Sequence, residues 1–289
     1  GCLFKIGIAL LIFIGMIFVL FCMVLIMPSE EYETVNYDIP NMRDYYTHIK
    51  GNGEDKVTLM VYMVGSDLES DGGAASEDIA EMTAANADNI NITLQTGGAA
   101  AWENASISDG KTERHIIKNG ELQNVENLGE AQMTSPNMLT DFIKWSASNY
   151  PADRYELVLW NHGGGTALGF GYDEMYPDDM LSLSQIGNAL SDSGIKFDIV
   201  GFDACLMGTI ETAYMLEPYA DYLVASEEYE PGTGWYYSEW LKNLSDNMSM
   251  PTVEIGKKIV EDYINGPDSS FFDSNTLSIV DLREIPYTY

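Results

Sequence analysis

Apolar and polar residues alternate along the chain in blocks that predict strands and helices in turn. Residues 57–64 form an almost continuous apolar run that ends at Gly65, which is typical of a strand covered on both faces. In residues 76–87 the apolar side chains Ile79 and Met82 recur with helical spacing. This first strand and helix set the pattern for the rest of the chain.

The same alternation continues to the end of the sequence. We expect further strands at residues 92–95, 115–118, 121–125, 155–160, 197–202, 222–225 and 276–280. We expect further helices at residues 135–149, 182–193, 209–216, 235–244 and 253–264. Strands that alternate with helices predict an α/β domain with a mainly parallel sheet flanked by helices.

The first 27 residues have a different pattern. Residues 3–27 are continuously apolar except for Lys5, and their length exceeds the roughly 20 residues that a helix needs to cross a bilayer. We therefore predict a transmembrane helix. A cleaved signal peptide is the rival interpretation, but its apolar core is about 7–15 residues long. A lipoprotein signal at Cys22 is less favoured because the bulky Phe21 precedes it.

Charge around this helix predicts how the protein lies in the membrane. Lys5 precedes most of the apolar run and acidic residues follow it, so the positive-inside tendency places the domain outside the cytoplasm of a single-pass cell-membrane protein. We expect residues 28–55 to form a stalk and residues 56–289 to form the folded domain. Because the sequence stops straight after a predicted strand, we also expect the C-terminal part of the domain to be truncated.

The charge composition restricts the classes of binding partner. The chain has 14 Lys and Arg against 45 Asp and Glu, a formal net charge of −31. Such a polyanion has no electrostatic attraction to nucleic acid, so nucleic acid is excluded as a partner. Its 46% hydrophobic residues are enough for a folded core. The acidity favours basic peptides or divalent cations as ligands, and a non-catalytic acidic surface module that binds either of them is one hypothesis for function.

Two motifs with reactive side chains follow two successive strands. The strand at 155–160 runs into Asn161-His162-Gly163-Gly164-Gly165, and the strand at 197–202 runs into Asp203-Ala204-Cys205. Reactive groups of open α/β sheets gather beyond the carboxyl ends of strands, and neighbouring strands lie about 4.8 Å apart. We therefore expect the imidazole and the thiol to meet at one edge of the sheet.

These groups have complementary chemistry. A cysteine thiolate is a nucleophile, and a histidine beside it takes and returns the proton during acyl transfer. The N–H groups of Gly163 and Cys205 are candidates for stabilising an oxyanion. A lone histidine, a glycine triplet or a single cysteine is more often structural, but together they favour catalysis.

The segments Leu159–Gly165 and Gly201–Gly208 resemble the paired signature of the clostripain family of cysteine peptidases, and the resemblance covers roughly residues 56–285. It implies a caspase-like fold and a His162–Cys205 dyad that cleaves peptide bonds after Arg or Lys through an acyl-enzyme. It also implies that Asp203 lines the pocket for the basic side chain. Glu227 and Glu228 are candidates for a second wall of this pocket, although charge statistics favour surface positions for both. A transpeptidase that passes the thioester to an amine is a further alternative.

One departure from the family concerns maturation. Several relatives cut themselves after a basic residue between the histidine and the cysteine, whereas Lys196 is the only Lys or Arg from Gly163 to Ala204. We therefore predict a single-chain enzyme, or maturation by other means than self-cleavage after a basic residue in the loop 166–181. No cofactor is expected to be required. Calcium is a weaker expectation that rests on the acidic residues of 172–179, which lack the spacing of a Ca²⁺ loop.

Overall fold

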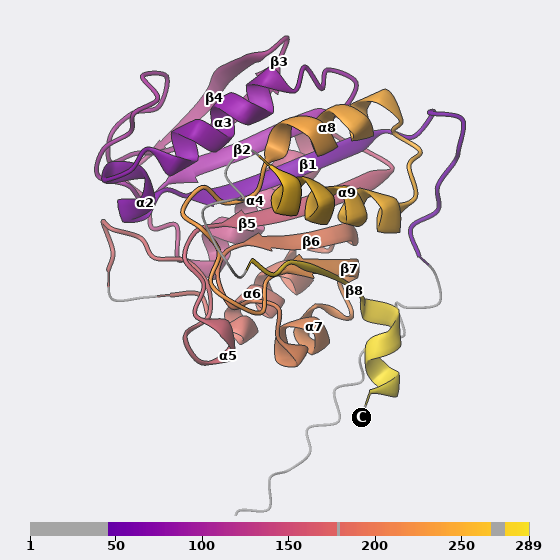
Figure 1. Cartoon of the computed structure of the whole chain (residues 1–289). Helices are drawn as coiled ribbons and strands as arrows, with labels where there is room; N and C mark the ends of the chain where they lie inside the picture. The colour runs from indigo at the N-terminus through magenta and orange to yellow at the C-terminus, as the bar shows by residue number, and fades with distance from the viewer. Residues whose placement is uncertain (1–45, 178–179, 267–274, 289) are drawn as a thin grey trace, which may run out of the picture. The chain divides into compact units, whose positions relative to one another are not determined.

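The computed structural model describes residues 46–288 apart from 178–179 and 267–274 (Figure 1). Within them the strands form one sheet in the order β4-β3-β2-β1-β5-β6-β7-β8. Strands β2, β1, β5, β6 and β7 are parallel, and β3, β4 and β8 are antiparallel to their neighbours. The strands are β1 Val57–Val64, β2 Asn91–Gly97, β3 Thr112–Lys118, β4 Glu121–Gly129, β5 Arg154–Trp160, β6 Phe197–Asp203, β7 Ala220–Ala225 and β8 Ser278–Asp281.

Helices cover both faces of this sheet, and each face has its own apolar core. Helices α3, α8 and α9 cover one face, and α4, α6 and α7 cover the other (Figure 1). Their bounds are α3 Ala74–Ala84, α4 Pro136–Asn149, α6 Leu183–Ser193, α7 Ile210–Leu216, α8 Tyr237–Asp246 and α9 Thr252–Asn265. In β1, Leu59 and Val61 face the first core while Met60 and Tyr62 face the second. The apolar run of this strand is therefore explained by burial on two sides.

The sequence-based prediction of an α/β fold with a mainly parallel sheet is confirmed. The longer elements lie where the hydrophobic pattern predicts them, with ends that differ by a few residues. Two short helices, α2 Ser66–Ser70 and α5 Gly165–Leu168, were not predicted, because a helix of one turn is too short to show a period. A 3₁₀ helix, η2 Leu282–Tyr287, also follows β8.

Residues 46–55, expected to be part of a stalk, contact the domain. The Tyr46 ring stacks on Tyr222 with centroids 5.7 Å apart, and the Arg283 guanidinium carbon lies 4.1 Å from the Tyr46 ring centroid. The backbone N–H of Thr47 donates to Asp221 Oδ2 at 2.7 Å. Residues 46–47 therefore pack against the β7–β8 side of the sheet, and Lys50 and Gly53 contact Asp153 and Ser249 elsewhere in the domain.

The predicted membrane helix at residues 3–27 lies outside the described residues. Among the residues that are described, none of the helices has the length and apolar character needed to cross a bilayer. The membrane helix therefore stays a prediction from the sequence.

A carboxyl group is buried inside the sheet at Glu156 of β5, and its Oε1 has no hydrogen-bond partner among the described residues. The neighbouring Arg154 donates instead to Asp198, with 2.6 Å between Nε and Oδ2. Burial raises the pKa of Glu156 to about 8, against the opposing effect of the Arg154 charge. The folded protein thus keeps a proton on Glu156 at neutral pH.

The substitution Glu156→Gln should remove part of the pH dependence of stability. Between about pH 4.5 and 8 the unfolded chain loses the Glu156 proton and the folded chain keeps it, so unfolding is favoured progressively as pH rises. The variant should therefore gain stability over the parent by up to about 1.4 kcal/mol for each pH unit in this window. Urea unfolding at pH 5.5 and 7.5 measures this difference, and an equal difference at both pH values contradicts the prediction.

Candidate active site

The pairing of β5 with β6 brings the two reactive side chains to the same edge. The last paired residues are Trp160 and Asp203, and the N–H of Asn161 donates to the Asp203 carbonyl at 3.2 Å. His162 and Cys205 each lie two residues beyond this pair. Since the strands are parallel, both side chains leave the carboxyl edge of the sheet at the same level.

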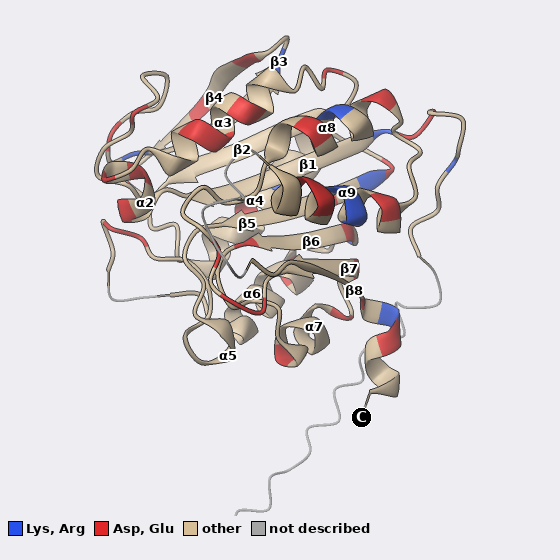
Figure 2. Ribbon diagram, in the orientation of Figure 1, with Lys and Arg blue, Asp and Glu red and all other residues tan. Residues whose placement is uncertain are grey.

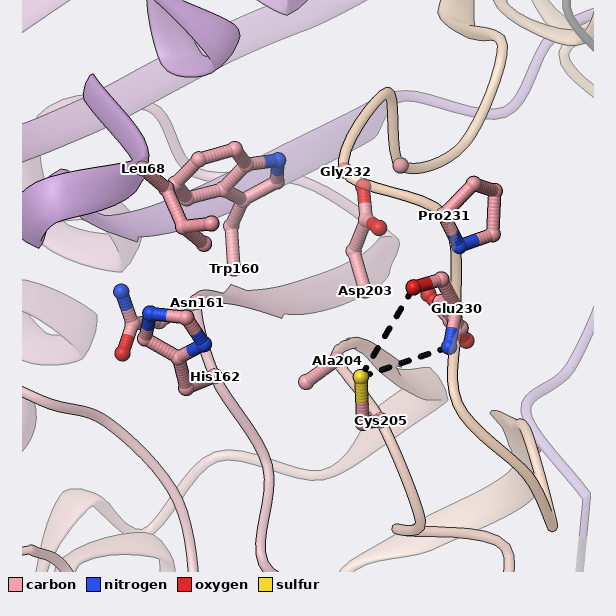
Figure 3. A pocket seen from close by; sticks show the side chains of 11 residues that line it. Leu68, Trp160, Asn161, His162, Asp203, Ala204, Cys205, Glu230, Pro231 and Gly232 are labelled. Carbon is pink, nitrogen blue, oxygen red and sulfur yellow. Dashed lines mark hydrogen bonds between the residues drawn. The ribbon is translucent and has the colours of Figure 1, made fainter. Parts of the chain in front are cut away.

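The two side chains line one pocket of about 280 Å³ (Figure 3). Figure 3 shows the imidazole and the sulfur on facing sides of the pocket, with one ring nitrogen directed to the cysteine side. The lining residues are Leu68, Trp160, Asn161, His162, Asp203, Ala204, Cys205, Glu230, Pro231, Gly232 and Gly234. The structure therefore brings His162, Cys205 and Asp203 together, as the sequence analysis expects.

Gly163 is required for the close approach of the two strand ends. A Cβ atom added there would collide with the carbonyl oxygen of Cys205, which is backbone and has no rotamer to move away. Neither Gly163 N–H nor Cys205 N–H has an acceptor within the described part of the chain. Cys205 lines the pocket and Gly163 is outside its lining, so their role as donors to an anionic oxygen stays a prediction.

A strained turn follows Cys205 directly. Leu206 has a φ of 63°, in the left-handed region that non-glycine residues seldom adopt, and its N–H donates to the Glu228 carbonyl at 3.0 Å. The Cys205 sulfur accepts from the Glu230 N–H at 3.3 Å and lies 3.8 Å from the Glu230 carbonyl oxygen. These contacts leave the thiol partly exposed on the pocket wall.

His162 lies at the end of β5, and its side chain is 39% exposed. Its Nε2 is 2.9 Å from Asp67 Oδ1, and its ring makes an edge contact with Tyr172 at a centroid distance of 6.3 Å. The sequence analysis did not single out Asp67, because the contact joins residues that lie 95 positions apart.

Asp203 lies in the pocket wall and is buried. Its oxygens accept from the Trp235 N–H at 3.2 Å, and Oδ2 accepts from the Tyr237 hydroxyl at 2.8 Å. A second buried carboxyl, that of Asp78, accepts from Trp160 Nε1 at 2.6 Å. A Cβ on Gly234 would lie 2.9 Å from Asp203 Oδ1 and 3.2 Å from Asp78 Oδ2. The two carboxyls therefore approach the same point of the loop before α8.

Glu230 supplies a second carboxyl to the pocket lining, beside Asp203. Both of its carboxyl oxygens are buried, and neither has a hydrogen-bond partner among the described residues. Burial, followed by the nearby charge of Asp203, raises the pKa of Glu230 well above its ordinary value. Burial likewise raises the pKa of Asp203 to about 6. None of the residues that line the pocket is a Lys or Arg, so these carboxyls have no cation beside them in the pocket.

Glu227 and Glu228, proposed from the sequence as a second wall, do not line this pocket. Both are exposed, and Glu227 Oε1 accepts from Ser278 Oγ at 2.6 Å. The acidic residue of this segment that does line the pocket is Glu230. Three acidic residues lie close together in this segment, so the sequence alone does not show which one turns inward.

The acidic residues considered for calcium have other partners. Asp173 is buried and accepts from the N–H groups of Met133 at 2.8 Å and Met175 at 2.9 Å. Glu174 accepts from the Ala100 N–H at 2.9 Å. Residues 178–179 lie outside the described chain, and the described residues hold no cluster of three metal-ligating side chains. Calcium binding stays a prediction.

Fold and pocket together define an α/β protein that carries a cysteine and a histidine at the carboxyl edge of a parallel sheet. The model of the clostripain family matches residues 61–287, and the chain belongs to that family, as its sequence motifs indicate. It is 32% identical over 225 residues to clostripain from Hathewaya histolytica. That match covers 65% of this chain and 42% of clostripain, so the chain spans less than half of this relative.

Solved structures support the same fold. An X-ray structure of a secreted C11 cysteine protease from Bacteroides thetaiotaomicron, in complex with an irreversible peptide inhibitor, matches with a TM-score of 0.66 and 22% identity, over 80% of this chain and 67% of that chain. An inactive zymogen C11 protease from Parabacteroides distasonis matches with a TM-score of 0.61 and 22% identity, over 80% and 63% of the two chains. At this level of identity, the likeness shows the fold.

The substitution Gly163→Ala should impair the site without unfolding the domain. The added methyl group must push the Cys205 backbone away, and a displacement of about 1 Å at a reacting group can cost about 100-fold in rate. We expect a loss of that size in peptide hydrolysis or thiol labelling. The control is Gly187→Ala, since Gly187 lies in α6 outside the pocket and a Cβ there meets only the flexible side chain of Met215. Equal activity of the two variants contradicts the prediction.

Proposed function

We propose that this protein is a cysteine endopeptidase that cleaves peptide bonds after Arg or Lys. The observation that carries the proposal is a single pocket that presents a thiol, an imidazole and buried carboxyls without a cationic partner in the pocket. Membership of the clostripain family supports the peptidase activity. The acidic pocket supports the preference for a basic side chain.

In the proposed reaction the Cys205 sulfur attacks the carbonyl carbon of the scissile bond. Its proton passes to His162, which then gives it to the leaving amine as the C–N bond breaks. The N–H groups of Gly163 and Cys205 donate to the oxygen that becomes negative in the tetrahedral intermediate. Water, deprotonated by His162, then attacks the thioester, and departure of the carboxylic acid restores the thiol.

The proposed selectivity for basic side chains has an electrostatic cause. An isolated carboxylate in a buried position is unfavourable, and the raised pKa of Glu230 reflects this. A guanidinium or ammonium group that enters the pocket supplies the missing charge and hydrogen-bond donors. The carboxyls of Asp203 and Glu230 are therefore the proposed partners of the substrate side chain.

The substitution Glu230→Gln should weaken hydrolysis of Arg substrates selectively. Hydrogen bonds to charged groups contribute about 1.5–3 kcal/mol, so kcat/KM for an Arg reporter peptide should fall about 10- to 100-fold. Hydrolysis of the matched citrulline peptide, which is neutral and nearly the same shape, should change little. Glu227→Gln is the control, because Glu227 is exposed and outside the pocket. Equal losses on both peptides would contradict the charge-based selectivity.

The selectivity for Arg should also depend on pH in the parent protein. Burial raises the pKa of Asp203 to about 6 and raises the pKa of Glu230 well above its ordinary value, so both carboxyls carry protons at low pH and become negative as pH rises. The ratio of kcat/KM for the Arg peptide to that for the citrulline peptide should therefore rise with pH. Taking this ratio from pH 5 to 8 cancels the titration of the reacting groups. A ratio that is constant or falls with pH rejects the assignment.

The alternatives give different results with Cys205→Ala. The peptidase requires that the parent cleaves an Arg or Lys peptide and that this variant does not, while both remain folded. Binding of basic peptides by both proteins, without cleavage by either, would instead support a non-catalytic acidic module. Products joined to an added amine in place of water would indicate a transpeptidase.

We also propose that the chain acts without cutting itself between His162 and Cys205. In this segment the one basic residue is Lys196, which directly precedes β6 and forms an ion pair with Asp221. After prolonged self-incubation the purified protein should still run as one chain. N-terminal sequencing that finds a new end between residues 166 and 181 would contradict this prediction.

Two further features of the proposed function come from the sequence. We propose that residues 3–27 anchor the protein in the cell membrane with the peptidase domain on the extracytoplasmic side. The proposal is supported by their apolar character, which only Lys5 interrupts, and by the position of Lys5 near the start of the run. We also propose that the arrangement of the sheet is of the caspase-like type, which the resemblance to the clostripain family supports.

A further inference from the structure

The side chain of Asp67 is hydrogen-bonded to His162 from a third strand end. Asp67 lies in α2, directly after β1, and β1 is the neighbour of β5 in the sheet. Its Oδ1 is 2.9 Å from His162 Nε2. Neither the motifs of the sequence nor the pairing of β5 with β6 requires this contact.

The loop that carries Asp67 is held in place by buried hydrogen bonds. Ser66 is fully buried and has a φ of 52°, a strained value for a residue other than glycine. The side-chain amide of Asn161 donates to Ser66 Oγ at 2.8 Å and to the Val64 carbonyl at 2.6 Å. Asn161 directly precedes His162. The end of β1 is therefore tied to the residue beside the imidazole, and this sets the position of Asp67 relative to the ring.

The electrostatics show that Asp67 acts as a carboxylate. Burial acts to raise the pKa of Asp67, but the hydrogen bond and charge of His162 and the hydrogen bond of Ser66 outweigh it, and the pKa is lowered. A carboxylate has no proton to donate, so Nε2 must carry the hydrogen of this bond. The other ring nitrogen, Nδ1, is then left without a proton in the neutral ring, and it is the nitrogen on the side of Cys205 (Figure 3).

We propose that Asp67 is a positioning residue for the reaction, which holds His162 with a proton on Nε2 and Nδ1 directed at Cys205. This inference rests on the proposed role of His162 in the dyad. The proton of the Cys205 thiol passes to Nδ1, leaving a thiolate and an imidazolium, and the Nδ1 proton later goes to the leaving amine. Asp67 stays ionised throughout and balances the imidazolium charge.

Other groups near the imidazole do not take this role. Tyr172 meets the ring by its edge, and Cys205 is the group to be deprotonated. Asp203 and Glu230 line the same pocket, but the carboxylate of Asp203 accepts its hydrogen bonds from Trp235 and Tyr237. Asp67 is the carboxylate for which the structure gives a hydrogen bond to a nitrogen of His162.

Two substitutions separate the geometric and electrostatic parts of this role. Asp67→Ala removes both the acceptor and the charge, and we expect kcat for an Arg peptide to fall about 10- to 100-fold with KM nearly unchanged. Asp67→Asn keeps an oxygen that can accept from Nε2, so its kcat should lie between those of the parent and the Ala variant. Because it lacks the negative charge that favours the imidazolium, the alkaline limb of its kcat/KM profile should move to lower pH.

Asp71→Asn is the matched control, because Asp71 is an exposed aspartate at the end of the same helix. It should match the parent in kcat and in pH profile. Folding of each variant is checked by circular dichroism, and the nearly isosteric Asp67→Asn keeps the test valid if Asp67→Ala unfolds. An Asp67→Asn variant with the kcat and pH profile of Asp71→Asn overturns the proposal.

A second readout distinguishes failure of this inference from failure of the proposed function. The rate at which iodoacetamide alkylates Cys205, followed by mass spectrometry across pH, reports formation of the thiolate without any substrate. A parent protein that hydrolyses no peptide rejects the peptidase. The inference about Asp67 is then still supported if Asp67→Asn and Asp67→Ala slow alkylation near neutral pH relative to Asp71→Asn, and it is overturned if all three variants react alike.

Discussion

The candidate site depends on the backbone contact between the ends of β5 and β6. Parallel pairing as far as Trp160 and Asp203 fixes the level of both chains, and the missing Cβ of Gly163 lets them remain in contact beyond the last pair. His162 directly precedes Gly163, and Cys205 supplies the carbonyl group that Gly163 meets. The relative position of these two residues is therefore fixed by contacts of the backbone. Precise positioning of this kind is what a reaction between two side chains requires. The chain turns directly after Cys205, at Leu206 with its φ of 63°, and the Cys205 sulfur lies at the pocket wall.

A second constraint is the burial of polar groups around this contact. Asn161 uses its side-chain amide to bind the end of β1, and its Oδ1 accepts from the Tyr172 N–H. Buried polar groups that are satisfied in this way make a loop rigid. Glu230 is the opposite case, because its buried oxygens have no partner among the described residues. A buried group without hydrogen bonds lowers the stability of the fold. A ligand that donates the missing hydrogen bonds removes this cost, and its affinity is higher as a result.

The sequence was sufficient to predict the strands and the longer helices. It also predicted that His162 and Cys205 leave the sheet at the same edge. These features depend on local hydrophobic period and on strand polarity, both of which are readable from one chain. Asp67 and Glu230 could not be found in this way. Asp67 is brought to His162 by the pairing of β1 with β5, and Glu230 turns inward through contacts of its loop with Cys205. Such contacts exist only once the strand order is known.

Acidic residues therefore act at two ranges in the proposed function. Asp and Glu positions are spread over many helices and loops of the described chain (Figure 2). The excess of acidic residues gives a field that attracts cations but decays over about 8 Å at physiological salt. A field of that kind does not distinguish one basic peptide from another. The carboxyls of Asp203 and Glu230 act only on a side chain that enters the pocket, where less water screens the charge. Selectivity for a basic residue next to the scissile bond therefore comes from the buried pair, while the surface affects how fast a cationic substrate arrives.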